Sequence, residues 1–149
     1  MKKEIIRQIQ RKVIVLLRKN NNKPLYLTSV DSCSEVARLA GCWIFEKLPQ
    51  VKIYILKGKN VKNTKRCHDI LAIEQNFIID LIDPTIWQFF KNKKSIHIKT
   101  TDNLANGLLE AAKLYGGNWK ISEEFKVSDY KKAELQKIVA SNIKELNKK

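Results

Sequence analysis

The stretch HDILAIEQNFIIDLIDPT, residues 68–85, decides how this chain is interpreted. Two runs rich in Ile, Leu and Phe, about residues 67–74 and 77–83, are interrupted only by Gln75-Asn76. Apolar runs of this length on either side of a short polar pair are typical of a β-hairpin. Pro84 cannot donate to a strand ladder and therefore ends the second strand. The stretch predicts a hairpin that begins and ends with polar, ionisable side chains.

The expected register of this hairpin decides which carboxylate meets the histidine. A two-residue turn at 75–76 places His68 directly opposite Asp83, on the same face of the sheet. Asp80 then lies opposite Leu71 and points to the other face. Directly opposed Cβ atoms are about 4.5–5.5 Å apart, which is within reach of an imidazole–carboxylate hydrogen bond. We therefore predict a His68–Asp83 pair that excludes Asp80.

The rest of the chain predicts an α+β fold, with a small antiparallel sheet packed against helices. Apolar residues at helical spacing indicate helices over about residues 3–19, 33–47 and 103–115, and from about 128 to near the end. Further strands are expected over 51–56 and 96–100, with a short one near 119–121. The 149 residues suit a single domain, 1–149, that is large enough to bury a core.

Cys33 stands where the second of these helices begins. Ser32 and Glu35 match a capping box, in which each side chain bonds the backbone amide of the other residue. Cys33 is then the first helical residue, where the helix dipole and the unpaired amides favour a thiolate. The same amides could stabilise an oxyanion. Cys42 lies within the helix and is expected to be a buried apolar residue.

The chain carries a formal net charge of +14, which suits acidic protein surfaces, nucleic acid or anionic membranes. The loop at 57–66 leads directly into His68 and is expected to line one rim of a catalytic groove. Its basic residues that we predict to bind substrate are Lys59, Lys62, Lys65 and Arg66. The loop contains no aromatic residue for base stacking, so an acidic protein is favoured over nucleic acid. The alternative is a lysine-rich surface that is merely solvated.

Three cysteines without framework spacing argue against a disulfide scaffold and favour a reducing compartment. No apolar run approaches the roughly 20 residues that span a bilayer, and the start of the chain lacks the pattern of a signal peptide. A cytoplasmic location is expected, or export as an effector without a cleavable signal. No zinc-binding spacing is present, so we predict no metal and no cofactor.

The order of a helix-borne Cys, a strand-borne His and an Asp-Pro-Thr string resembles papain-like and transglutaminase-like cysteine hydrolases. The chain is most similar to bacterial papain-fold toxins and glutamine deamidases. The matching residues, within about 31–90, are Cys33, His68, Asp83, Pro84, Thr85, Gln88 and Phe89. The glutamine that papain-like proteases use as oxyanion donor is replaced by Leu27, which leaves Thr28 or Ser29 as substitutes. Ser34 follows the cysteine where those proteases often carry Trp.

The resemblance implies a catalytic triad of Cys33, His68 and Asp83, with Gln88 at the substrate site. The expected activity is a cysteine-dependent amidohydrolase acting on a protein, as a glutamine deamidase, transglutaminase or protease. The thiolate attacks an amide carbonyl, and His68 serves as base and then acid. Two alternatives remain: a basic module that binds nucleic acid or protein, and an inactive member of the fold.

Overall fold

The computed structural model describes residues 1–148 and builds them around one five-stranded antiparallel sheet. Its strands are β1 (Lys52–Lys59), β2 (Cys67–Gln75), β3 (Ile78–Ile82), β4 (His97–Thr101) and β5 (Asn118–Glu124). Their order across the sheet is β4-β3-β2-β1-β5, so the predicted hairpin of β2 and β3 lies in its interior. The predicted α+β class with an antiparallel sheet is confirmed.

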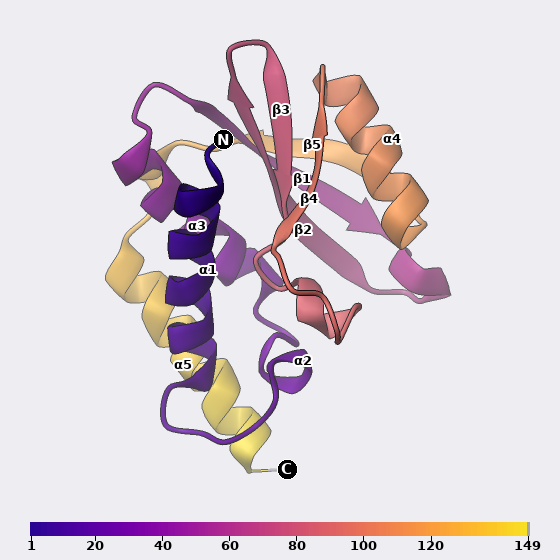
Figure 1. Ribbon diagram of the computed structural model, residues 1–149. Helices are drawn as coiled ribbons and strands as arrows, with labels where there is room; N and C mark the ends of the chain where they lie inside the picture. The colour runs from indigo at the N-terminus through magenta and orange to yellow at the C-terminus, as the bar shows by residue number, and fades with distance from the viewer. Residues whose placement is uncertain (149) are drawn as a thin grey trace.

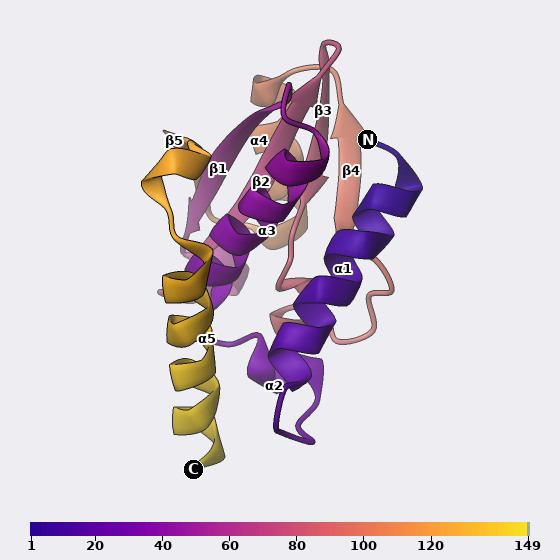
Figure 2. The same ribbon diagram turned by 90° about the vertical axis from the view of Figure 1, so that its left-hand side faces the viewer.

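Helices cover both faces of this sheet, as Figures 1 and 2 show. On one face lie α1 (Lys3–Arg18), α3 (Cys33–Lys47) and α5 (Lys132–Asn147), and on the other lies α4 (Leu104–Tyr115). A short helix that the sequence did not predict, α2 (Leu25–Thr28), precedes α3. Short 3₁₀ turns at Val61–Asn63, Ile86–Gln88 and Val127–Asp129 complete the chain. Within residues 1–148, no helix has the length and apolarity to cross a bilayer.

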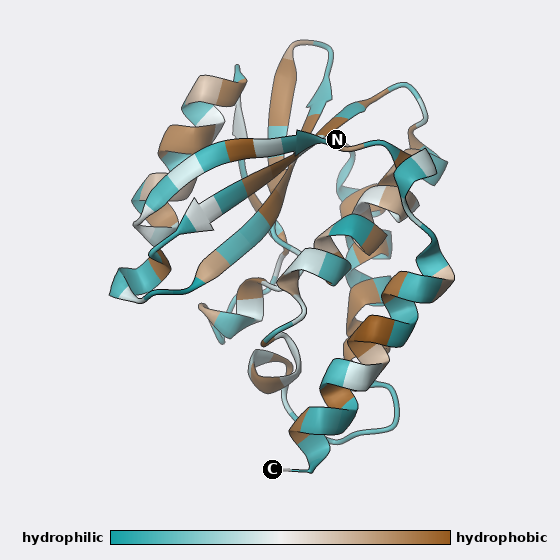
Figure 3. Cartoon of the chain, turned by 180° about the vertical axis from the view of Figure 1, so that it is seen from behind, coloured by the Kyte–Doolittle hydropathy of each residue, from teal (hydrophilic) through white to brown (hydrophobic). Residues whose placement is uncertain are grey.

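Alternation along β2 divides the core into two layers. Leu71 and Ile73 pack with α1, α3 and α5, whereas Ile70 and Ala72 pack with α4. This follows from the two-residue period of a strand, which sends successive side chains to opposite faces. Both faces of β2 are therefore buried, and Figure 3 shows hydrophobic residues along the strands and alternating hydropathy along the helices. His68 shares the parity of Ile70 and points toward the α4 side.

The turn of the β2–β3 hairpin lies one residue later than predicted. Gln75 pairs with Ile78, and the turn consists of Asn76 and Phe77, with φ of 54° and 63°. Left-handed values at both central positions define the type I′ turn that suits the twist of a hairpin. Asn adopts this conformation readily, whereas Phe77 does so with strain and leaves its ring 93% exposed.

This shift corrects the predicted pairing without changing which face each side chain occupies. Asp80 lies opposite Ile73 and not Leu71, and the ladder ends at the pair Leu71–Ile82, before it reaches His68. The predicted direct opposition of His68 and Asp83 is therefore wrong. Because the turn still contains two residues, the parity is kept, and His68 and Asp83 remain on one face with Asp80 on the other.

The predicted capping box at the start of α3 is also wrong. The α3 helix begins at Cys33 as expected, but the Ser32 side chain makes no cap hydrogen bond. Instead, the Ser32 hydroxyl accepts a hydrogen bond from Asn142 Nδ2 of α5 at 3.3 Å. Docking of α5 thus outcompetes the local cap. The first-turn amides of α3 consequently have no side-chain acceptor at the N-cap position.

Candidate active site

The centre of the site is a buried pair formed by His68 and Asp83. His68 Nε2 lies 2.7 Å from Asp83 Oδ2, and both side chains are 0% exposed. The Asp83 carboxylate is held by its own loop, since its Oδ1 accepts from the Thr85 amide at 3.0 Å. This Asx turn follows from an aspartate placed where the strand ends at a proline. The structure therefore brings together the two side chains that the sequence paired.

Tyr115, the last residue of α4, completes the environment of this carboxylate. Its hydroxyl donates to Asp83 Oδ2, the same oxygen that faces His68. Tyr115 is 1% exposed, and burial together with the neighbouring Asp83 holds its pKa well above the ordinary tyrosine value. Tyr115 therefore acts as a donor to Asp83 at all ordinary pH values. Sequence reasoning missed it, because it lies 32 residues further along the chain.

Cys33 is the member of the predicted triad that solvent reaches. It is the first residue of α3 and is partly exposed, whereas His68 is fully buried. Its thiol contributes to the raised pKa of the imidazole, so the two side chains lie near each other. The three predicted catalytic residues are therefore brought together, with Cys33 partly open to solvent and His68 buried.

The charge of His68 follows from competition between its surroundings. Burial lowers the pKa of the imidazole, but the Asp83 carboxylate and the Cys33 thiol outweigh it and raise the pKa from 6.5 to about 10. A raised histidine pKa means that the imidazolium is favoured in the folded protein. At neutral pH the site accordingly contains a positive charge on His68, beside Asp83 and near Cys33.

Gln88 occupies the other ring nitrogen of His68. Its Nε2 lies 3.1 Å from His68 Nδ1 and donates to Thr85 Oγ1 at 3.0 Å, while its Oε1 accepts from Arg66 at 3.0 Å. In this orientation Nδ1 is an acceptor, which matches a neutral imidazole and not the charged form that its pKa favours. The fixed, buried Asp83 carboxylate favours the charged imidazole, and the Gln88 amide can turn about its terminal bond to match it. Turning the amide points Oε1 at Nδ1–H and breaks the contact with Arg66.

A single arginine ties the cysteine helix to the strand that carries the histidine. Arg38 donates to the Ser34 hydroxyl at 2.8 Å, to Asp69 Oδ2 at 2.9 Å and to Glu123 Oε1 at 2.6 Å. Ser34 follows Cys33, and Asp69 follows His68 on the opposite face of β2. A guanidinium forms several hydrogen bonds in fixed directions, so it sets the relative position of the two segments. Its position among the apolar residues of α3 is the sequence feature that marks this arginine as buried.

Aromatic rings enclose the imidazole on its remaining sides. The ring centroids of Phe89, Tyr115 and Trp119 lie 4.8, 5.2 and 6.4 Å from that of His68. Trp119 lies against β1 at Gly58, where an added Cβ would come within 2.4 Å of the indole. Gly58 pairs with His68 on one side and with Trp119 on the other. A glycine is therefore needed at this position for the indole to cover the site.

The predicted basic rim is present only in part. Arg66 lies over the Phe89 ring at 5.0 Å, and Lys62 lies over the Phe90 ring at 4.3 Å. Both aromatic residues also contact Tyr115, so these two cations border the site. Lys59 and Lys65 are exposed and form no ion pair within residues 1–148. Of the four predicted residues, Arg66 is the one joined to the triad, through Gln88.

The two candidate oxyanion donors before the cysteine are both turned inward. The Thr28 hydroxyl donates to the Leu25 carbonyl at 3.5 Å and is 1% exposed. The Ser29 hydroxyl is fully buried and has no hydrogen-bond partner in the described part of the chain. The first-turn amides of α3 therefore remain as the donors closest in sequence to the sulfur.

Asp80 belongs to a different cluster on the opposite face of β3. It accepts hydrogen bonds from His97 Nε2 at 2.8 Å and from the Thr100 hydroxyl at 2.7 Å. Burial alone would raise the pKa of Asp80, but these bonds and the N-terminal ammonium group hold it well below its ordinary value. Asp80 therefore joins β3 to β4 and lies on the opposite face of the sheet from His68 and Asp83, as the sequence predicted.

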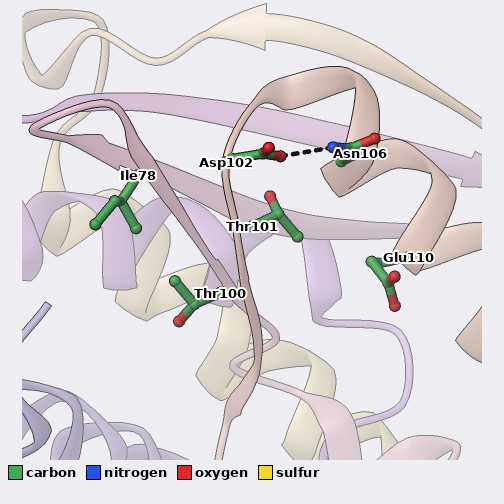
Figure 4. A pocket seen from close by; sticks show the side chains of 6 residues that line it. All are labelled: Ile78, Thr100, Thr101, Asp102, Asn106 and Glu110. Carbon is green, nitrogen blue, oxygen red and sulfur yellow. Dashed lines mark hydrogen bonds between the residues drawn. The ribbon is translucent and has the colours of Figure 1, made fainter.

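An open hollow beside β4 offers no competing catalytic centre. It has a volume of about 470 Å³, and Figure 4 shows the side chains that line it. Among them, Asn106 donates a hydrogen bond to Asp102 at 2.5 Å. Its lining contains neither cysteine nor histidine. Among residues 1–148, no group of three or more His, Cys, Asp or Glu side chains is placed to hold a metal ion.

Comparison of the chain with protein-family models, curated proteins and solved structures found no match.

Proposed function

We infer that the protein is a cysteine-dependent amidohydrolase that acts on protein substrates through Cys33, His68 and Asp83. The observation that carries this proposal is the buried His68–Asp83 pair at 2.7 Å, with the partly exposed Cys33 near the imidazole. Moving two charged side chains from water into the protein interior costs free energy. Ionisable groups whose pKa values are strongly shifted by such burial and pairing are concentrated at functional sites. The papain-like and transglutaminase-like resemblance of residues 31–90 supports the same reaction class.

The proposed reaction begins with the Cys33 thiolate. It attacks the carbonyl carbon of an amide, a carbon–sulfur bond forms, and the first-turn amides of α3 stabilise the oxyanion. His68 then donates a proton to the leaving nitrogen, the carbon–nitrogen bond breaks, and a thioester remains. Water attacks the thioester while His68 accepts its proton, which releases the acid and restores the thiolate.

The two nitrogens of His68 have separate tasks in this reaction. Nε2 is committed to Asp83, so the proton that reaches the leaving group comes from Nδ1. Asp83 fixes the orientation of the ring and stabilises its charged form, as the carboxylate does in a catalytic triad. Gln88 must turn or move aside when Nδ1 donates, because its amide nitrogen lies 3.1 Å away. Its contact with Arg66 is then exchanged for one with the imidazolium.

The proposed substrate class is a solvent-accessible amide on a protein, with a glutamine side chain as the leading candidate. Cys33 is only partly exposed and the imidazole is covered by aromatic rings, so a slender side chain fits this approach better than a folded backbone segment. Arg66 and Lys62 at the border of the site would attract acidic neighbours of the target amide.

Thiol reactivity provides the test, because the chain contains its own control. Cys67 is exposed and Cys33 only partly so, yet the proposal predicts that iodoacetamide at a pH of about 6 labels Cys33 faster. Peptide mapping by mass spectrometry gives both rates in one sample. His68→Asn should slow Cys33 and leave Cys67 unchanged. Faster labelling of Cys67 in the native protein would contradict the activated thiol.

Activity is then measured on casein as a protein that carries accessible glutamines. Ammonia release identifies deamidation, incorporation of a labelled amine identifies transamidation, and new amino termini identify proteolysis. Each must be lost in Cys33→Ser to count. If Cys33 is activated but none of these three activities is found, the proposed reaction class is wrong for casein, and other amides should then be tested.

A further inference from the structure

A second feature of the molecule, a groove between α1 and α5, lies away from the candidate active site. It has a volume of about 1020 Å³. Its apolar lining includes Val15 and Leu16 of α1, Ile143 of α5 and Trp43 of α3. Trp43 stands ten residues after Cys33 on the same helix, which corresponds to roughly 15 Å along its axis. No residue of the predicted triad lines the groove.

The rims of this groove are uniformly basic. Arg11, Lys12 and Lys19 stand on the α1 side, and Lys137 and Lys144 stand on the α5 side. The lining contains no aspartate or glutamate, and within residues 1–148 none of these five cations forms an ion pair. Unpaired charges of one sign on both sides of a concave apolar strip create a strong attraction for anionic groups.

Exposed apolar side chains accompany these charges. The apolar face of α1 is well buried, but Val15 lies outside that face and is 69% exposed. Ala140 of α5 is also exposed and Leu16 is half-buried, so a contiguous apolar strip of the groove is open to solvent. The combination of an apolar strip and flanking cations is complementary to an amphipathic helix whose polar flanks are acidic.

We propose that the groove between α1 and α5 binds an acidic amphipathic helix of a partner protein. Such a helix carries apolar residues at positions i, i+3, i+4 and i+7 and Asp or Glu on both flanks. The basic positions extend from Arg11 to Lys19 on α1 and from Lys137 to Lys144 on α5, about 12 and 10 Å by helical rise. These lengths match roughly two turns of a bound helix.

Two other anionic partners fit this surface less well. Single-stranded nucleic acid binds on exposed aromatic rings, but the aromatic residue in this groove, Trp43, is 7% exposed and lies beneath Lys12 at 5.5 Å. An anionic bilayer meets a convex apolar face, whereas these residues line a hollow. The partner helix satisfies both the concave shape and the charge.

The probe for this proposal is a fluorescein-labelled peptide of about 16 residues, long enough to form a helix, with Leu on one face and Glu on the flanks. Fluorescence polarisation at about 0.15 M salt measures its binding, and a scrambled peptide of the same composition controls for charge alone. We expect Lys12→Glu combined with Lys144→Glu to weaken binding at least tenfold. The matched control is Lys120→Glu combined with Lys126→Glu, which makes the same charge change on exposed residues elsewhere and should preserve binding.

An apolar variant tests the floor of the groove independently of charge. Val15→Ser alters an exposed side chain, so the fold is expected to survive, and it should weaken the peptide and not the scrambled control. Equal binding of both peptides, or equal losses in the two charge-reversed proteins, would overturn the proposal. It would also be overturned if oligothymidylate or phosphatidylglycerol vesicles, and not the peptide, bound with the same dependence on Lys12 and Lys144. Circular dichroism checks each variant for folding.

Discussion

Replacement of Asp83 by Asn is the most informative change in this protein, because it separates the charge of the carboxylate from its shape. The raised pKa of His68, about 10 against an ordinary 6.5, corresponds to roughly 5 kcal/mol in favour of the imidazolium. Burial acts in the opposite direction. Without the Asp83 charge, burial dominates, and the pKa of His68 should fall to its ordinary value or below.

The expected consequence is a change in the pH dependence of Cys33 alkylation. In the native protein the imidazolium of His68 persists up to a pH of about 10, where His68 loses its proton. In Asp83→Asn the alkylation rate at neutral pH should fall by at least tenfold, and turnover by up to about 10⁴. The measurement is the alkylation rate of Cys33 from acid to alkaline pH, with Cys67 as the internal standard.

Stability gives a second reading of the same change, with a definite sign. A raised histidine pKa stabilises the folded state fully below about 6.5, and this contribution is lost as the pH rises through about 10. The difference in Tm between native protein and Asp83→Asn should therefore shrink over that interval. Asp80→Asn is the control: it keeps an oxygen that can accept from His97 and Thr100 but removes the negative charge beside His97 and the N-terminal ammonium group, so it should lower Tm without changing the Cys33 profile. A native pH profile in Asp83→Asn, or a shifted one in Asp80→Asn, would refute the assignment of the triad.

Three further substitutions test the supports of the site. Tyr115→Phe removes the donor to the Asp83 carboxylate and should lower the free energy of unfolding by about 1.5–3 kcal/mol in urea titrations, a prediction that a neutral result would contradict. Arg38→Met leaves the buried Asp69 carboxylate without its guanidinium and should slow Cys33 alkylation, with partial rescue by Arg38→Lys; if Tm falls while alkylation is unchanged, Arg38 is structural only. Gly58→Ala forces the adjoining indole to move and should cost about 1–3 kcal/mol by thermal unfolding, whereas an unchanged Tm would mean that the ring is free to shift.

Local sequence signals were sufficient for most elements and for the shared face of His68 and Asp83. The helical periodicity and the apolar runs predicted the positions of α1, α3 and the β2–β3 hairpin, because these elements are set by burial of one face or of both. The face shared by His68 and Asp83 followed from the number of residues in the turn. Each of these features depends on residues that lie close together in the sequence.

The supports of the site depend on contacts between segments that are distant in sequence. Arg38 meets Asp69 and Glu123 across 31 and 85 residues, and Tyr115 meets Asp83 across 32. The cap of α3 was predicted wrongly for the same reason, since a side chain of α5 takes the Ser32 hydroxyl. A single sequence shows which groups can bond but not which of several partners the tertiary fold will bring near.

The two-residue turn at Asn76 and Phe77 limits which insertions and deletions the chain can tolerate at this position. Loss or gain of one residue there would exchange the two faces of β3, turning Asp80 toward the α4 side and burying the wrong row of side chains. Loss or gain of two residues would keep every side chain on its face and only slide the strand along its neighbour. Length changes at this tip are therefore expected to be tolerated in pairs. The number of residues in the exposed turn is therefore constrained by the site, because it decides which face of the sheet each side chain of β3 occupies.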